Sequence, residues 1–278
     1  MQADEKPTFI DQQTAQIRWL KSFEQKDSRR FFPSGFPKHD QTAGKFQRGA
    51  FHVIAARPGI GKTSYLVAIS YHQAKAGTTA YYITMEMPVE ALWHRLACLH
   101  ADRLTLRELT EGEFSDCLVS YIINLSTELE KFSPLFFENS DYDAFERAVI
   151  ATVKPSSDSI LLIDYLGLFS MRRLGPEQRY FLVSEIARRL KLLARTLDIP
   201  VITAVQLNRD IEKRSKKNPI LADLRDSGDI ENHADAVFAL TREQEVLSVD
   251  ILKNRNGPLG AYTLHFDGPR AAVEEFER

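Results

Sequence analysis

The chain is poor in cysteine, with two in 278 residues. Cys98 and Cys117 lie in apolar, helix-like stretches and lack the spacing of paired metal ligands, which argues against a disulfide framework or a zinc site. The sequence also lacks an excess of one charge, because 36 Lys and Arg stand against 38 Asp and Glu, a formal net charge of −2. Any site for a polyanion must therefore be local rather than spread over the whole surface.

Long apolar runs are missing as well. No stretch approaches the length of a membrane-spanning helix, and the opening residues MQADEKPTFIDQQ do not form a charged-then-apolar targeting pattern. We therefore expect a cytoplasmic protein with no membrane partner. The composition is that of a globular protein, 44% hydrophobic and 27% charged, which is enough for one substantial core.

Residues 1–34 differ from the rest of the chain. Ile17, Leu20 and Phe23 recur at helical spacing with Trp19 beside them, and the pattern breaks at FFPSGFP. We expect a short amphipathic helix on a tether, which packs either on its own domain or on a neighbouring subunit. The predicted domains are thus 1–34 and 35–278.

From about residue 50, strand-like runs alternate with helical patterns, and three closely spaced strand-like runs close the chain. Such alternation predicts an α/β fold with a mainly parallel central sheet, and the closing runs predict hairpin-like antiparallel pairing. The predicted strands are 51–56, 79–84, 135–138, 159–164, 200–207, 235–240, 246–253 and 261–266, and the main predicted helices are 63–77, 88–101, 142–153 and 177–198.

The stretch VIAARPGIGKTS ends an apolar strand on a glycine-rich turn and opens a helix. It fits the Walker A pattern, except that Ala56 stands where glycine is usual. Backbone N–H groups of such a turn wrap a phosphate, Lys62 contacts the β- and γ-phosphates, and Thr63 binds Mg²⁺. The predicted nucleotide-binding residues are Ala56, Arg57, Pro58, Gly59, Ile60, Gly61, Lys62, Thr63 and Ser64.

Two acidic residues follow other apolar strands. Asp164 ends SILLID, and a buried carboxylate beside a phosphate loop is suited to hold Mg²⁺, although it could also cap the next turn. Glu86 follows YYITM, and the carboxyl ends of parallel strands line one edge of a sheet. Glu86 could therefore act as a general base on water, or it could be a carboxylate favoured by the next helix dipole.

Taken with later segments, these residues resemble the motor domain of DnaB-type replicative helicases, which are RecA-like P-loop ATPases. The resemblance spans roughly residues 35–270. It rests on motifs in the family's order, namely ARPGIGKTS, TMEMPVEAL, LLIDYLGL, PVITAVQLNR, LADLRDSGDIENHADAVFAL and KNRNGPLG.

The resemblance implies roles for single residues. Glu86 corresponds to the catalytic glutamate, Asp164 to the Walker B acid, and Gln206 to a sensor of the γ-phosphate. Lys253 and Arg255 correspond to a basic finger that enters the nucleotide site of the adjacent subunit. ATP and Mg²⁺ are the implied cofactors, and a homo-oligomer, expected to be a hexamer, is the implied assembly.

Two loops are implied to contact single-stranded DNA. One is GLFSMRRLGPEQR, and the other runs from about Asn208 to Gly228. A motor that passes any sequence should hold phosphates rather than base edges, and these loops are basic with few aromatics. Asp226 stands where the family usually has glutamate. The DNA-binding candidates are Arg172, Arg173, Arg179, Lys213, Arg214, Arg225, Asp226 and Gly228.

Three functions agree with these motifs. The first is an ATP-dependent ring helicase that moves 5′ to 3′ on single-stranded DNA during replication, with primase or a helicase loader as a further partner. The second is a filament-forming recombination ATPase, and the third is an accessory ATPase that does not unwind DNA. Family members usually carry an N-terminal helical domain, and here only about 34 residues precede the motor. The chain is therefore expected to be a minimal helicase, a fragment or an accessory protein.

Overall fold

The structure is a computed structural model. It divides into two units, Met1–Arg30 and Phe31–Arg278. In the first unit, residues 12–17 are helical, whereas Trp19, Leu20 and Phe23 of the predicted amphipathic helix lie outside the described residues. The 1–34 and 35–278 division stays a prediction. The described residues are 11–17, 31–112, 115–171, 178–214, 218–224 and 228–276.

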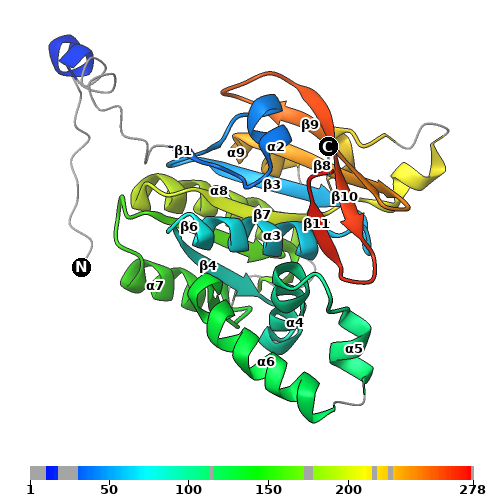
Figure 1. Cartoon of the computed structure of the whole chain (residues 1–278). Helices are drawn as coiled ribbons and strands as arrows, with labels where there is room; N and C mark the ends of the chain where they lie inside the picture. The colour runs from blue at the N-terminus through cyan, green and yellow to red at the C-terminus, as the bar shows by residue number, and fades with distance from the viewer. Residues whose placement is uncertain are drawn as a thin grey trace. The chain divides into compact units, whose positions relative to one another are not determined.

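Among the described residues, nine strands form one central sheet (Figure 1). Six neighbouring strands are parallel: β5 (Leu135–Phe137), β4 (Thr79–Thr84), β6 (Ser159–Asp164), β7 (Val201–Gln206), β3 (Phe51–Ala56) and β8 (Ala236–Glu243). The sheet then continues in antiparallel pairing through β9 (Val246–Asn254), β10 (Gly260–Asp267) and β11 (Ala272–Glu274). This arrangement confirms the predicted α/β class with its parallel sheet and antiparallel C-terminal extension.

Helices cover the parallel part of the sheet on both faces, which is why its strands are almost entirely apolar. Along β3, Ile54 and Ala56 join one core cluster, while Val53 and Ala55 join the other. The first cluster includes side chains of α3 (Lys62–Lys75), α4 (Val89–His100), α5 (Leu106–Glu111) and α6 (Asp116–Leu129). The second includes side chains of α7 (Tyr142–Thr152), α8 (Arg179–Leu197) and α9 (Gly228–His233).

Several short elements escaped prediction because they span too few residues to show a period. The pair β1 (Phe31–Phe32) and β2 (Phe46–Gln47) forms a separate small sheet. Between them, α2 (Pro37–Thr42) buries His39, whose Nδ1 lies 3.0 Å from the Tyr65 hydroxyl. The 3₁₀ helices in the described ranges are η2 (Glu130–Phe132), η3 (Leu166–Leu168), η5 (Arg209–Lys213) and η6 (Leu221–Asp223).

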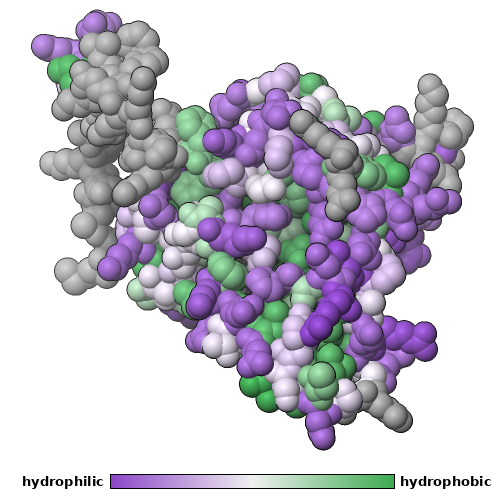
Figure 2. All heavy atoms as spheres, viewed as in Figure 1, coloured by the Kyte–Doolittle hydropathy of each residue, from purple (hydrophilic) through white to green (hydrophobic). Residues whose placement is uncertain are grey.

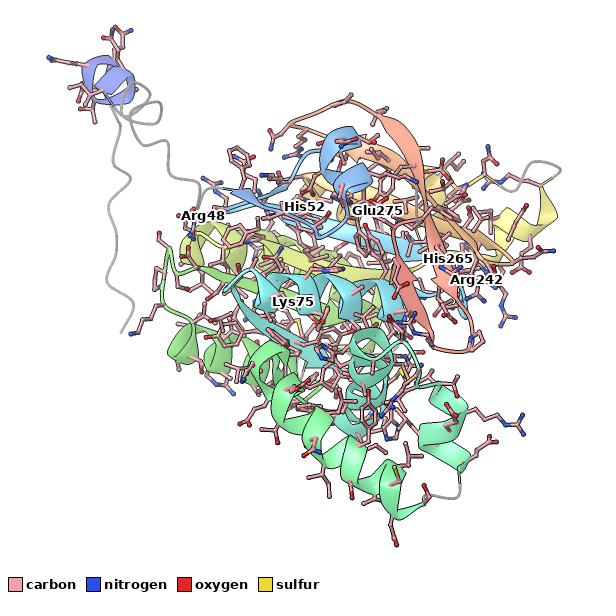
Figure 3. The ribbon with its side chains drawn as sticks, in the orientation of Figure 1. Arg48, His52, Lys75, Arg242, His265 and Glu275 are labelled. Carbon is pink, nitrogen blue, oxygen red and sulfur yellow. The ribbon has the colours of Figure 1, made fainter. Side chains whose placement is uncertain are left out.

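The strand register gives the sheet two functional edges. At the carboxyl edge of the parallel strands, Ala56 pairs with Gln206 and Thr84 pairs with Asp164. Because β9 is antiparallel, its last residue, Asn254, pairs at the amino edge, next to the start of β8. Figure 3 labels Arg48, which precedes β3, and Arg242, near the end of β8, at opposite ends of the strands.

Within the described ranges, we find no helix with the length and apolar character needed to cross a membrane.

Candidate functional site

The predicted phosphate loop connects β3 to α3 at the carboxyl edge. Gly59 and Gly61 have φ angles of 76° and 122°, which L side chains rarely adopt. A Cβ atom on Gly61 would also lie 2.8 Å from Cε2 of Phe266, a residue of β10. The glycines therefore allow both the turn and the close approach of the C-terminal strand, and Ala56 is fully buried as the last residue of β3.

Lys62 is the first residue of α3, and its side chain turns back over the loop. Its Nζ donates to the backbone oxygens of Ala56 at 3.5 Å and Arg57 at 3.4 Å, both long for hydrogen bonds. Burial lowers the pKa of Lys62, while the charges of Asp164 and Glu86 act to raise it. A buried ammonium that makes such long contacts with the loop has the donor capacity to bind a phosphate placed there.

Asp164 ends β6 and is 1% exposed. The Tyr82 hydroxyl donates to its Oδ2 at 3.0 Å, while its buried Oδ1 has no hydrogen-bond partner among the residues that the structure describes. Burial raises the pKa of Asp164, and the nearby hydroxyls of Thr63 and Tyr82 act to lower it. A buried carboxylate oxygen in this condition, beside a threonine hydroxyl, fits the ligand chemistry of Mg²⁺.

Glu86 and Gln206 belong to the same edge. Glu86 lies two residues beyond β4 and is exposed, and its negative charge acts to raise the pKa values of both Lys62 and Asp164. Gln206 ends β7 directly beside Ala56 in the parallel register. The structure thus brings together Lys62, Thr63, Asp164, Glu86 and Gln206, which the sequence motifs had singled out separately.

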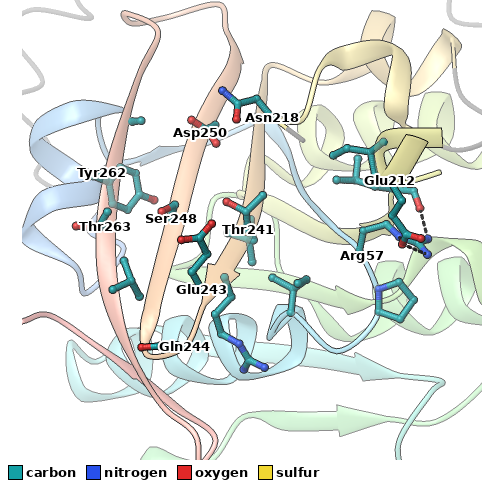
Figure 4. A pocket seen from close by; sticks show the side chains of 18 residues that line it. Arg57, Glu212, Asn218, Thr241, Glu243, Gln244, Ser248, Asp250, Tyr262 and Thr263 are labelled. Carbon is teal, nitrogen blue, oxygen red and sulfur yellow. Dashed lines mark hydrogen bonds and ion pairs between the residues drawn. The ribbon is translucent and has the colours of Figure 1, made fainter. Parts of the chain in front are cut away.

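A groove of about 1370 Å³ extends from the phosphate loop along the antiparallel strands (Figure 4). Arg57, Pro58 and Ile60 line its loop side, and the polar face of β8, β9 and β10 lines the other. Thr241 pairs with Ser248, which pairs with Thr263, so one polar residue from each strand lies on this face. Sequence reasoning missed the groove, although the alternation of apolar and polar residues in these strands carried the signal.

Arg242 is a second feature that the motifs did not indicate. Its guanidinium lies 4.0 Å from the centroid of the Phe266 ring, and Phe266 packs close to Gly61. A cation over an aromatic face is a stabilising arrangement, and here it holds a positive charge beside the phosphate loop and the groove that Arg242 also lines.

Lys253 and Arg255 lie at the opposite edge. Lys253 Nζ donates to the Glu231 backbone oxygen, and Arg255 Nη2 donates to the Asn232 backbone oxygen at 2.6 Å, with Nη1 3.7 Å from Asp235. Burial and the Arg255 charge lower the pKa of Lys253. Asp235 bonds the Phe51 backbone N–H, so these cations lie near the start of β3, five residues or roughly 17 Å from Ala56 along the strand.

The predicted DNA-binding residues are only partly described. Arg172, Arg173, Arg225 and Asp226 lie outside the described residues. Arg179 Nη2 donates to the Gly167 backbone oxygen at 3.0 Å, and Arg214 forms an ion pair with Asp223. Lys213 ends η5 and Gly228 begins α9, so both lie at the boundaries of ordered elements.

Residues 32–276 match the family described as DnaB-like helicase C terminal domain. The chain belongs to this family. The replicative DNA helicase DnaC of Bacillus subtilis is 33% identical over 251 residues, covering 84% of this chain and 54% of that protein. The replicative DNA helicase DnaB of Helicobacter pylori strain 26695 is 34% identical over 214 residues, covering 76% of this chain and 43% of that protein. The chain thus spans about half the length of the curated relatives it matches.

Solved structures share the fold. One that is described as an ATPase domain superposes with a TM-score of 0.86 at 26% identity, covering 97% of this chain and 100% of that one. A DnaB-like replicative helicase, whose structure was described with its interactions with primase, superposes with a TM-score of 0.83 at 26% identity, covering 98% of this chain and 68% of that one. The RecA-like fold of this DnaB-like domain is therefore confirmed.

Proposed function

We propose that this DnaB-like domain is the ATP-hydrolysing motor of a replicative ring helicase. The observation that carries the proposal is the meeting of Lys62, Asp164, Glu86 and Gln206 at one sheet edge, around a glycine loop that begins a helix. A phosphate loop, a buried carboxylate that can hold a cation and a nearby exposed glutamate are the parts that nucleotide hydrolysis requires.

The nucleotide proposed for this site is ATP with Mg²⁺. Backbone N–H groups of Arg57 and of Gly59 to Ser64, together with the Lys62 ammonium, would bind the phosphates, while the Thr63 hydroxyl and Asp164 would hold the cation. The cation neutralises charge on the phosphates when it is bound. The adjacent groove lies where the nucleoside of a loop-bound nucleotide would extend, with Arg242 on its wall.

Two side chains are assigned to the reaction itself. Glu86 lies outside the buried shell, where it can orient a water molecule toward the γ-phosphate and take up its proton. Gln206 extends from the strand that pairs with the loop strand, so its amide can register whether the γ-phosphate is present. Together, Glu86 and Gln206 would make the position of the segment after β7 depend on whether the γ-phosphate has been cleaved.

The charge needed at the transition state is proposed to come from a neighbouring subunit. Lys253 and Arg255 lie at the amino edge and are too distant from their own loop to contact the same nucleotide. A ring of copies, which we propose to be a hexamer, would place the amino edge of one subunit against the carboxyl edge of the next. Hydrolysis would then occur only where two subunits meet.

An apolar groove between α4, α5 and α6 is the proposed docking surface for the N-terminal helix of the next copy. Trp93, Leu109, Val119 and Ile123 line it, and Figure 2 shows apolar side chains gathered over α4 and α6 at the foot of the view. Ile123 is 61% exposed and Val119 is 41% exposed, so the groove leaves neighbouring apolar side chains open to solvent. The amphipathic pattern of Ile17, Leu20 and Phe23 supplies a matching partner within this same chain.

Single-stranded DNA is the proposed track. The basic residues of the two loops, including Arg172, Arg173, Arg179, Lys213, Arg214 and Arg225, with Asp226 and Gly228 at the end of the second loop, would contact successive phosphates in a central channel. A contact with primase or a helicase loader is proposed from the solved DnaB-like helicase that was described with primase. We also propose that the protein is located in the cytoplasm.

An unwinding assay on forked DNA tests the proposal. With ATP and Mg²⁺, we expect this chain to separate a fork that carries both tails and to fail when the 5′ tail is removed. Unwinding of a fork that keeps only its 3′ tail would reverse the proposed 5′ to 3′ direction. DNA-stimulated hydrolysis without strand separation would favour the accessory ATPase instead.

A further inference from the structure

The phosphate loop is tied to the segment that follows β7 by one side chain. Arg57 Nε and Nη2 lie 2.9 Å and 2.8 Å from Oε1 of Glu212, and its Nη1 donates to the Leu207 backbone oxygen at 3.0 Å. Figure 4 shows this pair at one end of the groove. Arg57 therefore connects the nucleotide edge to η5, across 155 residues of sequence.

The segment that receives this contact is closed at its base. Leu207 forms an isolated antiparallel bridge with Leu224, and the Asn208 N–H donates to the Asp223 backbone oxygen at 2.7 Å. Asp223 also pairs with Arg214, one residue beyond η5. The base of the segment is thus held by contacts of Leu207, Asn208 and Arg214 with Asp223 and Leu224.

The Arg57–Glu212 pair contributes little to the free energy of unfolding, so Glu212 can be replaced without unfolding the chain. The Glu212 side chain is 58% exposed, and ion pairs in such positions add little to the free energy of unfolding. Arg57 is, however, close enough to Lys62 that its charge acts to lower the pKa of that lysine. Anionic phosphates bound by Lys62 would therefore compete with Glu212 for the same guanidinium.

We propose that the Arg57–Glu212 ion pair couples occupancy of the nucleotide site to the DNA-contacting segment that begins with η5. Glu212 is proposed as a positioning residue that acts through Arg57. The proposal depends on the proposed function, because it takes the segment from Asn208 to Gly228 as a DNA contact. The ion pair would be a second connection between the nucleotide site and the segment that follows β7. The first is the Gln206 amide.

Reciprocity of coupling supplies the test. If nucleotide changes the affinity for DNA, DNA must change the affinity for nucleotide by the same factor. We measure the Kd of the full chain for an oligothymidine with and without a non-hydrolysable ATP analogue, for wild type, Glu212→Gln and Glu212→Asp. In Glu212→Gln we expect the ratio of the two Kd values to fall by about fivefold or more, with basal hydrolysis and Tm unchanged.

Glu212→Asp and one further variant, Glu111→Gln, separate coupling from general effects. Glu212→Asp keeps the charge and should recover part of the ratio. Glu111→Gln, which removes an exposed partner of Arg107 on α5, should behave as wild type. A Glu212→Gln chain with the wild-type ratio overturns the inference and leaves the proposed function intact. If the two Kd values of the wild-type chain are equal and DNA does not stimulate hydrolysis, both the inference and the proposed function are overturned.

Discussion

The two edges of the central sheet carry different kinds of chemistry. At the carboxyl edge, Lys62 and Asp164 are buried, and each retains unused bonding capacity. At the amino edge, the Arg255 side chain is 47% exposed and donates to a backbone oxygen of the α9 region. The carboxyl edge thus has groups suited to bind a nucleotide. The amino edge has an exposed arginine that lies far from the phosphate loop of its own chain. We therefore propose that each edge of a single chain contributes half of a site that two subunits complete.

Among the changes considered, removal of the Lys62 side chain should lower ATP hydrolysis most. Lys62→Ala removes the ammonium proposed to bind the phosphates in both the ground state and the transition state, so we expect hydrolysis to fall by more than about 10³-fold. Phosphate release in the presence of single-stranded DNA measures this loss. Lys75→Ala, at the exposed end of the same helix, is the matched control and should keep wild-type turnover. Wild-type turnover by Lys62→Ala itself would refute the site.

Loss of the cation at the amino edge should be nearly as damaging to hydrolysis, with nucleotide binding retained. We expect Arg255→Ala to lower turnover by about 10³-fold, because the missing charge acts only at the transition state. Binding of a fluorescent ATP analogue should stay unchanged, as should both properties in Arg107→Ala, whose side chain is 87% exposed on α5.

A mixture of variants tests whether the two edges meet. In equal parts of Arg255→Ala and Glu86→Gln chains, about one junction in four combines an intact cradle with an intact cation, because neighbours associate at random. Partial recovery of hydrolysis is therefore expected. If the mixture is as inactive as its components, the contribution between subunits loses its support.

Asp164→Asn tests the role of the buried carboxylate at the carboxyl edge through the pH dependence of Tm. Because burial raises the pKa of Asp164 above its ordinary 3.8, the folded state holds this proton more tightly than the unfolded state. Its contribution to stability therefore falls as the pH rises past 3.8 through the raised value. We expect the variant to lose this part of the pH dependence of Tm, together with Mg²⁺-dependent hydrolysis. A pH profile of Tm identical to wild type would contradict the assignment.

The smallest expected effect is on subunit association, and it comes from a change in the apolar groove between α4, α5 and α6, away from both edges of the sheet. Ile123→Glu places a charge in the apolar groove of α6, which should weaken subunit association by about tenfold while leaving Tm unchanged. Light scattering at a series of concentrations measures the assembly. Ile150→Glu is the control, because Ile150 is 56% exposed on α7 and outside this groove. Equal mass profiles for the two variants would count against docking at α4–α6.

Sequence patterns were sufficient for most of the sheet and for the residues at its carboxyl edge. Uninterrupted apolar runs predict strands buried on both faces, and the closely spaced glycines of the phosphate loop indicate a turn with positive φ angles. The patterns did not indicate Arg242 or Glu212, because their roles depend on contacts with Phe266 and Arg57 from distant segments. They also missed β1, β2 and α2, which are too short to show a period. Tertiary contacts, rather than local preference, determine these features.

The packing of Phe266 near Gly61 has a consequence for synthesis of the protein on the ribosome. Gly61 follows β3, Phe266 lies in β10, far later in the sequence, and the loop that includes Gly61 packs against the Phe266 ring. A nascent chain that has only reached β9 lacks this support, although every residue of the loop is already present. The growing polypeptide should therefore bind nucleotide with full affinity only after β10 has been made.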